Sequence, residues 1–275
     1  MQTNPRLAVD AAWALWWLGA ALAGLMAVLS IQHALTGVPV LLLASSVPTA
    51  QALRPEPVSA ARTTNQAPPA LPAAVFIPGV PFTAQAPQGD WSLPFGEACE
   101  EASVLMAVSW ARGAGALSPL QAEREILGQV AFEDYAFGYH FDTSLAQTLK
   151  LFTRYYDYRN VALAYDIRPE DIKRELARGN LVLVPVAGAL LANPYYASPP
   201  PYHMIVLIGY DDVAGEFIAH DPGTRRGASF RYPSARLFTA IHDWTGSDAT
   251  VSSGRKGMIV VRPENVSRKQ DNSEQ

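Results

Sequence analysis

Residues 86–113 read APQGDWSLPFGEACEEASVLMAVSWARG and contain Cys99, the only cysteine of the protein. A loop rich in Pro, Gly and Asp precedes Cys99, and an apolar run that ends at Gly113 follows it. This pattern predicts a helix that begins at Cys99. A thiol in the first turn of a helix faces unpaired N–H groups and the positive end of the helix dipole, and both favour the thiolate. Cys99 is therefore a candidate nucleophile.

A lone cysteine also has a simpler interpretation, as a small buried hydrophobic side chain. The adjacent Glu100 and Glu101 suit the start of any helix, and their negative charges oppose a thiolate at Cys99. The nucleophile hypothesis therefore depends on whether the rest of the chain supplies a base.

The composition and net charge of the chain exclude some classes of protein. The chain has 275 residues and a formal net charge of −4, and its basic residues are scattered. We therefore expect no nucleic-acid partner. The length suits one medium-sized domain with appendages, and a single cysteine excludes an internal disulfide.

Residues 11–31 (AAWALWWLGAALAGLMAVLSI) carry no charge and match the length of a helix that crosses a hydrocarbon core about 30 Å thick. Arg6 precedes this run and the next basic residue is Arg54, so the positive-inside rule predicts a cytoplasmic N-terminus. We expect a single-pass protein of the cell membrane whose main domain lies outside the cytoplasm.

The same run has two alternative interpretations. A buried core helix is disfavoured because the run has no polar face. A long signal peptide, cleaved near the small residues at 50–52, would instead release a secreted protein.

The chain divides into four segments by composition. Residues 45–73 are rich in Pro, Ala, Ser and Thr and cannot bury a core, and the C-terminal residues ENVSRKQDNSEQ are polar. The predicted organisation is a membrane anchor (1–32), a Pro/Ala-rich linker (33–75), a folded domain (76–264) and a disordered tail (265–275).

The folded domain has helical patterns first and strand patterns after them. Helices are predicted from Cys99, from a capping box at Ser118 with Pro119 to about Val130, from a cap at Asp142 or Thr143, and over 169–178. Strands are predicted over 181–186, directly after His203, over 216–221 and over 257–261, with a helix capped by Ser234 before the last. This order predicts an α+β fold with helices packed on an antiparallel sheet.

A cysteine nucleophile needs an imidazole as its base and a third group that orients the imidazole. His203 directly precedes a predicted strand, and the strand that returns after the Asp211-Asp212 turn ends at Asp221. Such a hairpin brings the start of its first strand beside the end of its second. We therefore expect the His203 and Asp221 side chains to lie within reach of each other.

The other histidines fit structural or solvated positions better. Side chains alternate along a strand, so His220 and Asp221 cannot face the same site. His33 lies beside the apolar run, His140 in a Gly/aromatic loop and His242 near a helix end. No HExxH or CxxC spacing occurs, and neither a metal nor another cofactor is predicted.

Acyl transfer also needs hydrogen-bond donors for the oxyanion. Gln85 and Gln88 both precede Cys99 in the same loop region, and either amide could act together with the Cys99 backbone N–H. Position alone does not choose between them.

Four segments, in order, resemble the C39-like family of papain-fold cysteine peptidases: VPFTAQAP (80–87), CEEASVLMA (99–107), YHMIVLIGYDD (202–212) and FIAHDPGTRRG (217–227). The resemblance covers about residues 80–263. It implies that Cys99 is the nucleophile, His203 the general base and acid, Asp221 its orienting partner and Gln85 the oxyanion glutamine. It also implies a papain-like fold, with the site in a cleft between a helical half and an antiparallel half.

The sequence departs from the C39 peptidases proper, because Ala98 and Glu100 stand where glycines are common and the segment QGDWSLPFGE lengthens the spacing between Gln85 and Cys99. No GxxxxGK[ST] loop occurs, so the resemblance is to the stand-alone branch. The expected function is a membrane-anchored cysteine peptidase that acts on peptides or proteins through an acyl-enzyme. The alternatives are an acyl transferase or cell-wall amidase with the same triad, and a non-catalytic binding module on the same fold.

Overall fold

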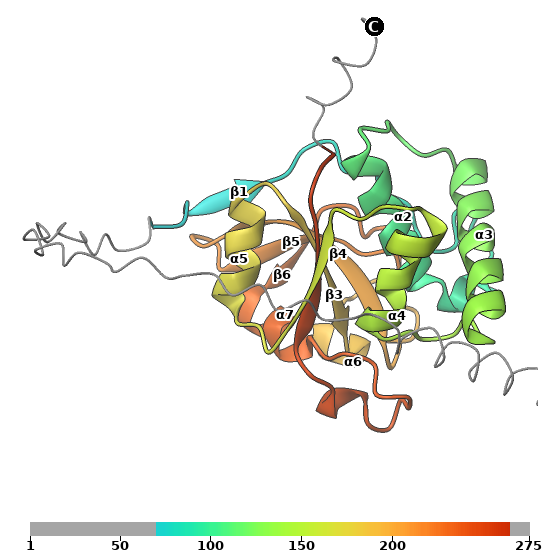
Figure 1. Cartoon of the computed structure of the whole chain (residues 1–275). Coiled ribbons are helices and arrows are strands. Elements are labelled where there is room, and N and C mark those ends of the chain that lie inside the picture. The colour runs from blue at the N-terminus through green and yellow to red at the C-terminus, as the bar shows by residue number, and fades with distance from the viewer. Residues whose placement is uncertain (1–69, 265–275) are drawn as a thin grey trace, which may run out of the picture. The chain divides into compact units, whose positions relative to one another are not determined.

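The structure, a computed structural model, describes residues 70–264 (Figure 1). Its first elements are β1 (Ala74–Phe76), the 3-10 turn η1 (Phe95–Glu97), α2 (Cys99–Ala111), α3 (Pro119–Phe137), α4 (Leu145–Lys150) and the π-helical turn η2 (Leu151–Tyr155). Next come β2 (Val161–Tyr165), α5 (Pro169–Ala177), β3 (Leu181–Val186), α6 (Gly188–Leu191), β4 (His203–Asp211) and β5 (Glu216–His220). The last are β6 (Phe230–Pro233), α7 (Ser234–Ala240), η3 (Val251–Ser253) and β7 (Gly257–Val261).

The strands of the described chain form one antiparallel sheet in the order β2-β7-β3-β4-β5-β6, and β1 pairs with the end of β4. β4 is central, because β3 pairs with one of its edges and β5 with the other. All residues of β3, and all of β4 up to Tyr210, are buried. The predicted antiparallel sheet is confirmed.

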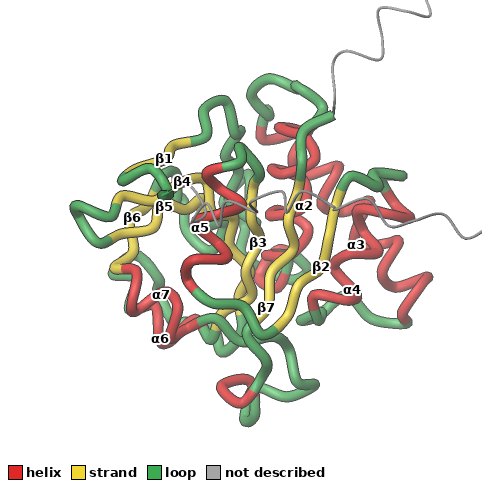
Figure 2. Tube along the Cα trace, turned by 60° about the vertical axis from the view of Figure 1, so that its left-hand side comes forward, coloured by secondary structure: helices red, strands yellow, loops and turns green. Residues whose placement is uncertain are grey.

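Helices cover both sides of this sheet. α2, with α3 outside it, lies on one side of the central strands, and α5 packs on β3 and β4 from the other (Figures 1 and 2). Val104 and Val108 of α2 belong to the core shared with the sheet, whereas Ala102 and Leu105 pack against α3. A helix that is apolar on every side is expected to be buried in this way. The predicted packing of helices on an antiparallel sheet is confirmed.

Most predicted helix starts are confirmed, namely those at Cys99, Pro119 and Pro169. The Ser118 capping box is present, but α3 continues beyond the predicted end near Val130. Phe132 packs against Phe137, with ring centroids 6.2 Å apart, and α3 stops where Gly138 adopts a φ of 80°.

Two predicted caps are wrong. Ser144, not Asp142 or Thr143, is the N-cap of α4, because the backbone N–H of Thr143 donates instead to the Glu100 carboxylate. Ser234 is the first residue of α7 rather than its cap.

Sequence patterns also missed β1, β2, β6 and α6. These elements are short, and β2 pairs only with β7, nearly a hundred residues further along the chain. The residues of β2 therefore do not by themselves indicate that this segment pairs as a strand.

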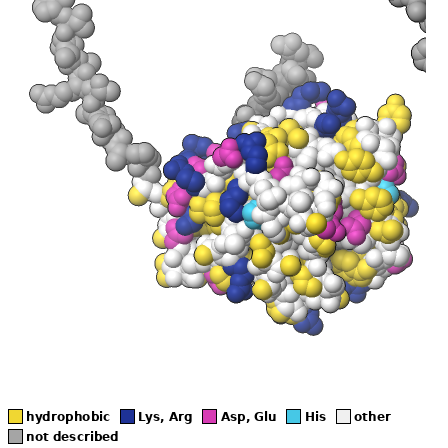
Figure 3. All heavy atoms as spheres, turned by 90° about the horizontal axis from the view of Figure 1, so that it is seen from below, with side chains coloured by type: hydrophobic (Ala, Val, Ile, Leu, Met, Phe, Trp, Pro, Cys, Tyr) yellow, Lys and Arg dark blue, Asp and Glu magenta, His cyan; other side chains and the backbone are white. Residues whose placement is uncertain are grey.

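The predicted membrane run, the predicted linker as far as residue 69 and the predicted tail lie outside the described residues and stay predictions. Ala74 and Val75, the last two residues of the predicted linker, belong to β1. Between residues 70 and 264, no helix is both long and apolar enough to span a bilayer. On the face drawn in Figure 3, basic, acidic and apolar side chains are interspersed.

β1 approaches β4 closely at Gly209, where a Cβ atom would collide with the backbone oxygen of Val75. We expect Gly209→Ala to lower the free energy of unfolding by about 1–3 kcal/mol, because backbone rather than a flexible side chain must move. Urea denaturation followed by tryptophan fluorescence measures this. Gly115→Ala is the control, since a Cβ there meets nothing within 4 Å. Equal stability of the two variants would contradict the close approach.

Candidate active site

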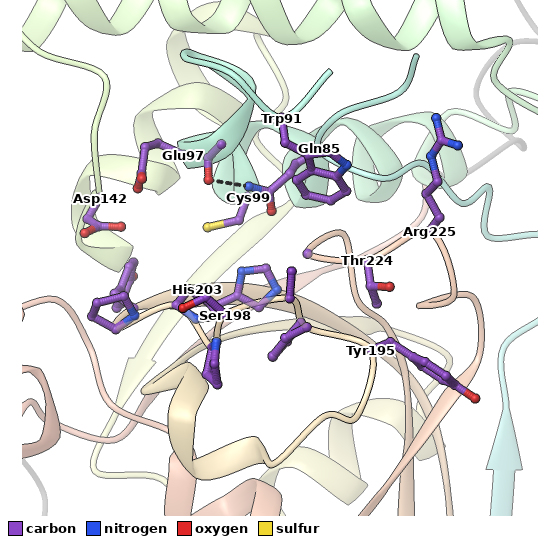
Figure 4. A pocket seen from close by; sticks show the side chains of 18 of the residues that line it. Gln85, Trp91, Glu97, Cys99, Asp142, Tyr195, Ser198, His203, Thr224 and Arg225 are labelled. Carbon is purple, nitrogen blue, oxygen red and sulfur yellow. Dashed lines mark hydrogen bonds between the residues drawn. The ribbon is translucent and has the colours of Figure 1, made fainter. Parts of the chain in front are cut away.

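A cavity of about 860 Å³ separates the N-terminal end of α2 from the start of β4 (Figure 4). Residues from both halves of the domain line it. The helical half contributes Gln85, Trp91, Gly96, Glu97, Cys99 and Asp142, and the strand half contributes residues 194–203, 223–226 and Asp248. The cavity therefore lies in the cleft between the two halves.

Cys99 is the first residue of α2 and is 3% exposed. Its sulfur donates a hydrogen bond to Oε2 of Glu100 at 2.9 Å. The other oxygen of Glu100 accepts the backbone N–H of Thr143 at 2.7 Å, which holds the carboxylate in place.

The surroundings of Cys99 favour the protonated thiol. Burial, and then the negative charges of Glu100 and Asp142, raise the pKa of the Cys99 thiol well above its usual value. The expectation that the helix N-terminus favours a thiolate is therefore overturned, because desolvation and nearby carboxylates outweigh the dipole.

His203 and Asp221 meet as the hairpin predicts. His203 is the first residue of β4, and Asp221 directly follows β5, which pairs with β4 from His220 opposite Val206 onward. Nε2 of His203 lies 2.8 Å from Oδ1 of Asp221, and their side chains are 2% and 0% exposed. Figure 4 shows the Cys99 sulfur on the side of the cavity that faces His203.

The carboxylate of Asp221 accepts four further hydrogen bonds. Oδ1 accepts the backbone N–H of Gly223 at 2.9 Å. Oδ2 accepts from the Asn193 amide at 3.0 Å, from the Tyr196 hydroxyl at 2.6 Å and from the Tyr232 hydroxyl. This number of donors is what a buried carboxylate needs to stay charged.

The hydrogen bonds determine the charge of Asp221 and the tautomer of His203. Burial by itself raises the pKa of Asp221, but the charge of His203 and the hydrogen bonds from His203 and the two tyrosines outweigh it and hold this pKa below its usual value. An ionised carboxylate only accepts hydrogen bonds, so Nε2 of His203 must donate. In the neutral ring, Nδ1 is then the basic nitrogen.

Sequence patterns missed the side chains that surround Asp221. Asn193 and Tyr196 stand in the loop NPYYASPPPY just before His203, and this position is the signal that could have identified them. The Tyr196 ring also packs edge-on against the His203 ring, with centroids 5.8 Å apart. Tyr232 lies on β6, a strand that the sequence pattern did not predict.

Of the two candidate oxyanion glutamines, Gln85 lines the cavity, whereas Gln88 is exposed and donates to Glu123. The amide nitrogen of Gln85 donates to the carbonyl oxygens of Phe95 at 3.0 Å and Gly96 at 2.8 Å. Its amide oxygen is buried and has no hydrogen-bond partner within residues 70–264.

The other described histidines have structural partners away from the cavity. His220 bonds the Val80 carbonyl at 3.1 Å and accepts from the Ser229 N–H at 3.0 Å, and burial lowers its pKa. His140 pairs with Asp134, and His242 bonds the carbonyl of Gly254. In the part of the chain that the structure describes, no group of three His, Cys, Asp or Glu side chains could hold a metal ion.

Comparison with known proteins identifies the family. Residues 77–248 match the Peptidase C39-like family, and the chain belongs to this family. The predicted resemblance is thereby confirmed. No curated protein matches the sequence. Similar solved structures include a Bacillus anthracis protein described as a C39-like peptidase, which is 16% identical with a TM-score of 0.46, over 69% of this chain and 98% of that chain.

Replacing Glu100 tests the electrostatic control of the thiol. Glu100→Gln keeps an acceptor for Thr143 but removes a negative charge beside the sulfur, so the pKa of Cys99 should fall. One pKa unit corresponds to a rise of about tenfold in thiolate at neutral pH. Rates of alkylation by iodoacetamide between pH 6 and 10 measure the shift, with the exposed Glu170→Gln as control. An unchanged pH profile would show that Glu100 does not govern the thiol.

Proposed function

We propose that the protein is a cysteine peptidase that hydrolyses peptide bonds through Cys99, His203 and Asp221. The observation that carries the proposal is the buried His203–Asp221 pair, which opens onto the same cavity as the only cysteine of the chain. Membership of the Peptidase C39-like family supports it.

The first step is proton transfer within the cavity. Asp221 engages Nε2 of His203, so Nδ1 is the nitrogen that takes the proton of the Cys99 thiol. Because burial and nearby carboxylates raise the pKa of Cys99, the site favours the thiol over a preformed thiolate. Proton transfer therefore accompanies attack of the sulfur on the substrate carbonyl carbon.

The tetrahedral intermediate then needs donors for its oxyanion. The backbone N–H of Cys99 lies in the first turn of α2, where helical N–H groups have no partner within the helix. Gln85 is the second proposed donor. An amide nitrogen carries two hydrogens, so Gln85 can turn one from Phe95 or Gly96 to the oxyanion and keep the other in place.

Collapse of the intermediate completes the cycle. The C–N bond breaks as His203 gives its proton to the leaving amine, and the acyl group stays on the sulfur of Cys99. His203 then takes a proton from water, whose oxygen attacks the thioester. The carboxylic acid leaves, and the proton returns to the thiol.

The proposal includes attachment to the cell membrane through residues 11–31, with the peptidase domain outside the cytoplasm. Its support is the length of this uncharged run and the absence of basic residues between Arg6 and Arg54.

Substitutions within the triad should differ in severity. Cys99→Ala and His203→Ala should each lower kcat/KM by about 1,000-fold or more, because each removes a reacting group. Asp221→Asn should cost less, about 10- to 100-fold, since an amide oxygen still accepts the Nε2 hydrogen bond but no longer stabilises the imidazolium. Hydrolysis of a mixed peptide library, followed by mass spectrometry, identifies a substrate on which these rates are measured.

Two results would favour other functions. Transfer of the acyl group to added amines, or release of peptidoglycan fragments, would favour a transferase or an amidase with the same residues. Hydrolysis that persists in Cys99→Ala would contradict the peptidase mechanism.

Gln85 allows a sharper test of the oxyanion role. Gln85→Glu replaces a donor by acceptors opposite the carbonyls of Phe95 and Gly96, so it should lower both kcat and thermal stability. Gln85→Ala should lower kcat by about 10- to 100-fold with a smaller effect on stability. A normal kcat in Gln85→Ala would exclude Gln85 from the oxyanion site.

A further inference from the structure

The cavity is lined by acidic side chains at one end and by basic side chains at the other. Glu97, Asp142 and Asp248 line what we term the acidic end, and Arg225 and Arg226 line the basic end. Figure 4 shows Glu97 and Asp142 on one side of Cys99 and Arg225 on the other. The nucleophile therefore lies between the two charged ends.

Neither end is neutralised by the described part of the chain. No ion pair or side-chain hydrogen bond within residues 70–264 engages the carboxylates of Glu97, Asp142 or Asp248, and none engages the guanidinium groups of Arg225 or Arg226. The carboxylates instead repel one another. Burial, and then the charges of Glu100, Glu97 and Asp248, raise the pKa of Asp142 to about 8. Asp142 therefore largely keeps its proton near neutral pH, and a cation placed at this end would favour its ionised form.

Contacts with neighbouring residues hold the two arginines of the basic end in place. The Arg225 guanidinium occupies the space that a side chain at Gly89 would fill, and Arg226 lies over the Tyr195 ring, 4.9 Å from its centroid. Stacking on an aromatic face leaves the guanidinium donors free for a ligand. These contacts position two cations at the cavity wall without cancelling their charge.

Between the ends, the wall beside the nucleophile has an unmet acceptor. Gln85 lines the cavity and is buried, and its amide oxygen has no partner in the described residues. A buried acceptor of this kind costs free energy, and rotation of the Gln85 amide toward the cavity would let its oxygen accept an N–H group of a bound peptide.

On the basis of the peptidase function above, we propose that the substrate is a peptide segment with opposite charges on the two sides of the scissile bond. Its cationic side chain lies at the acidic end, and its carboxylate lies at the basic end.

Electrostatic complementarity of this kind selects both the substrate and its direction in the cleft. A segment bound in reverse places like charges together at both ends, which disfavours it strongly. Glu97 and Asp142 are half-buried, so a matched cation should change kcat/KM by roughly tenfold, whereas the exposed Arg225 and Arg226 should give a smaller change for the matched carboxylate.

Matched fluorogenic peptides test the proposal on the full chain. Each keeps the sequence of one cleaved library peptide and carries Lys or the uncharged norleucine on one side of the scissile bond, and Asp or Asn on the other, in both orientations. We expect one orientation of the Lys/Asp peptide to give a kcat/KM at least about tenfold above that of the norleucine/Asn peptide. The ratio should fall as salt is added.

Substitutions at each end of the cavity show which end causes the preference for each charged side chain of the peptide. The double substitution Glu97→Gln/Asp142→Asn should bring the Lys/norleucine ratio close to one and leave the Asp/Asn ratio unchanged. Arg225→Gln/Arg226→Gln should do the reverse. Glu170→Gln and Arg154→Gln remove exposed charges that do not line the cavity, and should change neither ratio.

The outcomes separate this proposal from the peptidase function. Cleavage that depends on Cys99 but shows equal kcat/KM for all the matched peptides overturns the charge preference and leaves the peptidase function intact. If no library peptide is cleaved, the peptidase function fails, and a labelled set of one fixed peptide sequence with the same Lys/norleucine and Asp/Asn exchanges in both orientations is tested for binding to Cys99→Ala by fluorescence anisotropy. Tighter binding of one Lys/Asp orientation supports it, and equal binding overturns it.

Discussion

The packing of α2 on β4 is the constraint on which the site depends. Cys99 begins α2 and His203 begins β4, and one turn further along the helix the Ser103 hydroxyl donates to the Met204 carbonyl at 3.2 Å. Apolar side chains of α2 join the sheet in one core around this bond. Because a close-packed interior has few alternative arrangements, this interface sets where the thiol stands relative to the imidazole.

Burial raises the pKa of both acids of the site, but their neighbours shift it in opposite directions. Asp221 is surrounded by donors, so it stays ionised although it is inaccessible to solvent. Cys99 is surrounded instead by carboxylates, of which Glu100 is the nearest, so it keeps its proton. The physical difference is the sign of the neighbouring partial charges rather than the depth of burial.

Much of the fold could be predicted because its signals are local. The start of α2 follows from the loop before Cys99, and the His203–Asp221 approach follows from strand lengths around the Asp211-Asp212 turn. The extra donors of Asp221 could not be predicted in the same way. Asn193 comes from a loop and Tyr232 from an edge strand, and only the folded sheet brings them to one carboxylate.

The sequence by itself determined the helix that begins at Cys99, the antiparallel sheet and the family, since these depend on patterns within short segments. Only the tertiary structure decided that burial and neighbouring carboxylates raise the pKa of the Cys99 thiol, that Nε2 of His203 bonds Asp221, and that carboxylates and guanidinium groups line opposite ends of one cavity. The physical reason is that the pKa of a side chain and the electrostatic potential of a cavity depend on burial and on charges only a few ångströms away. These charges come from segments far apart in the chain.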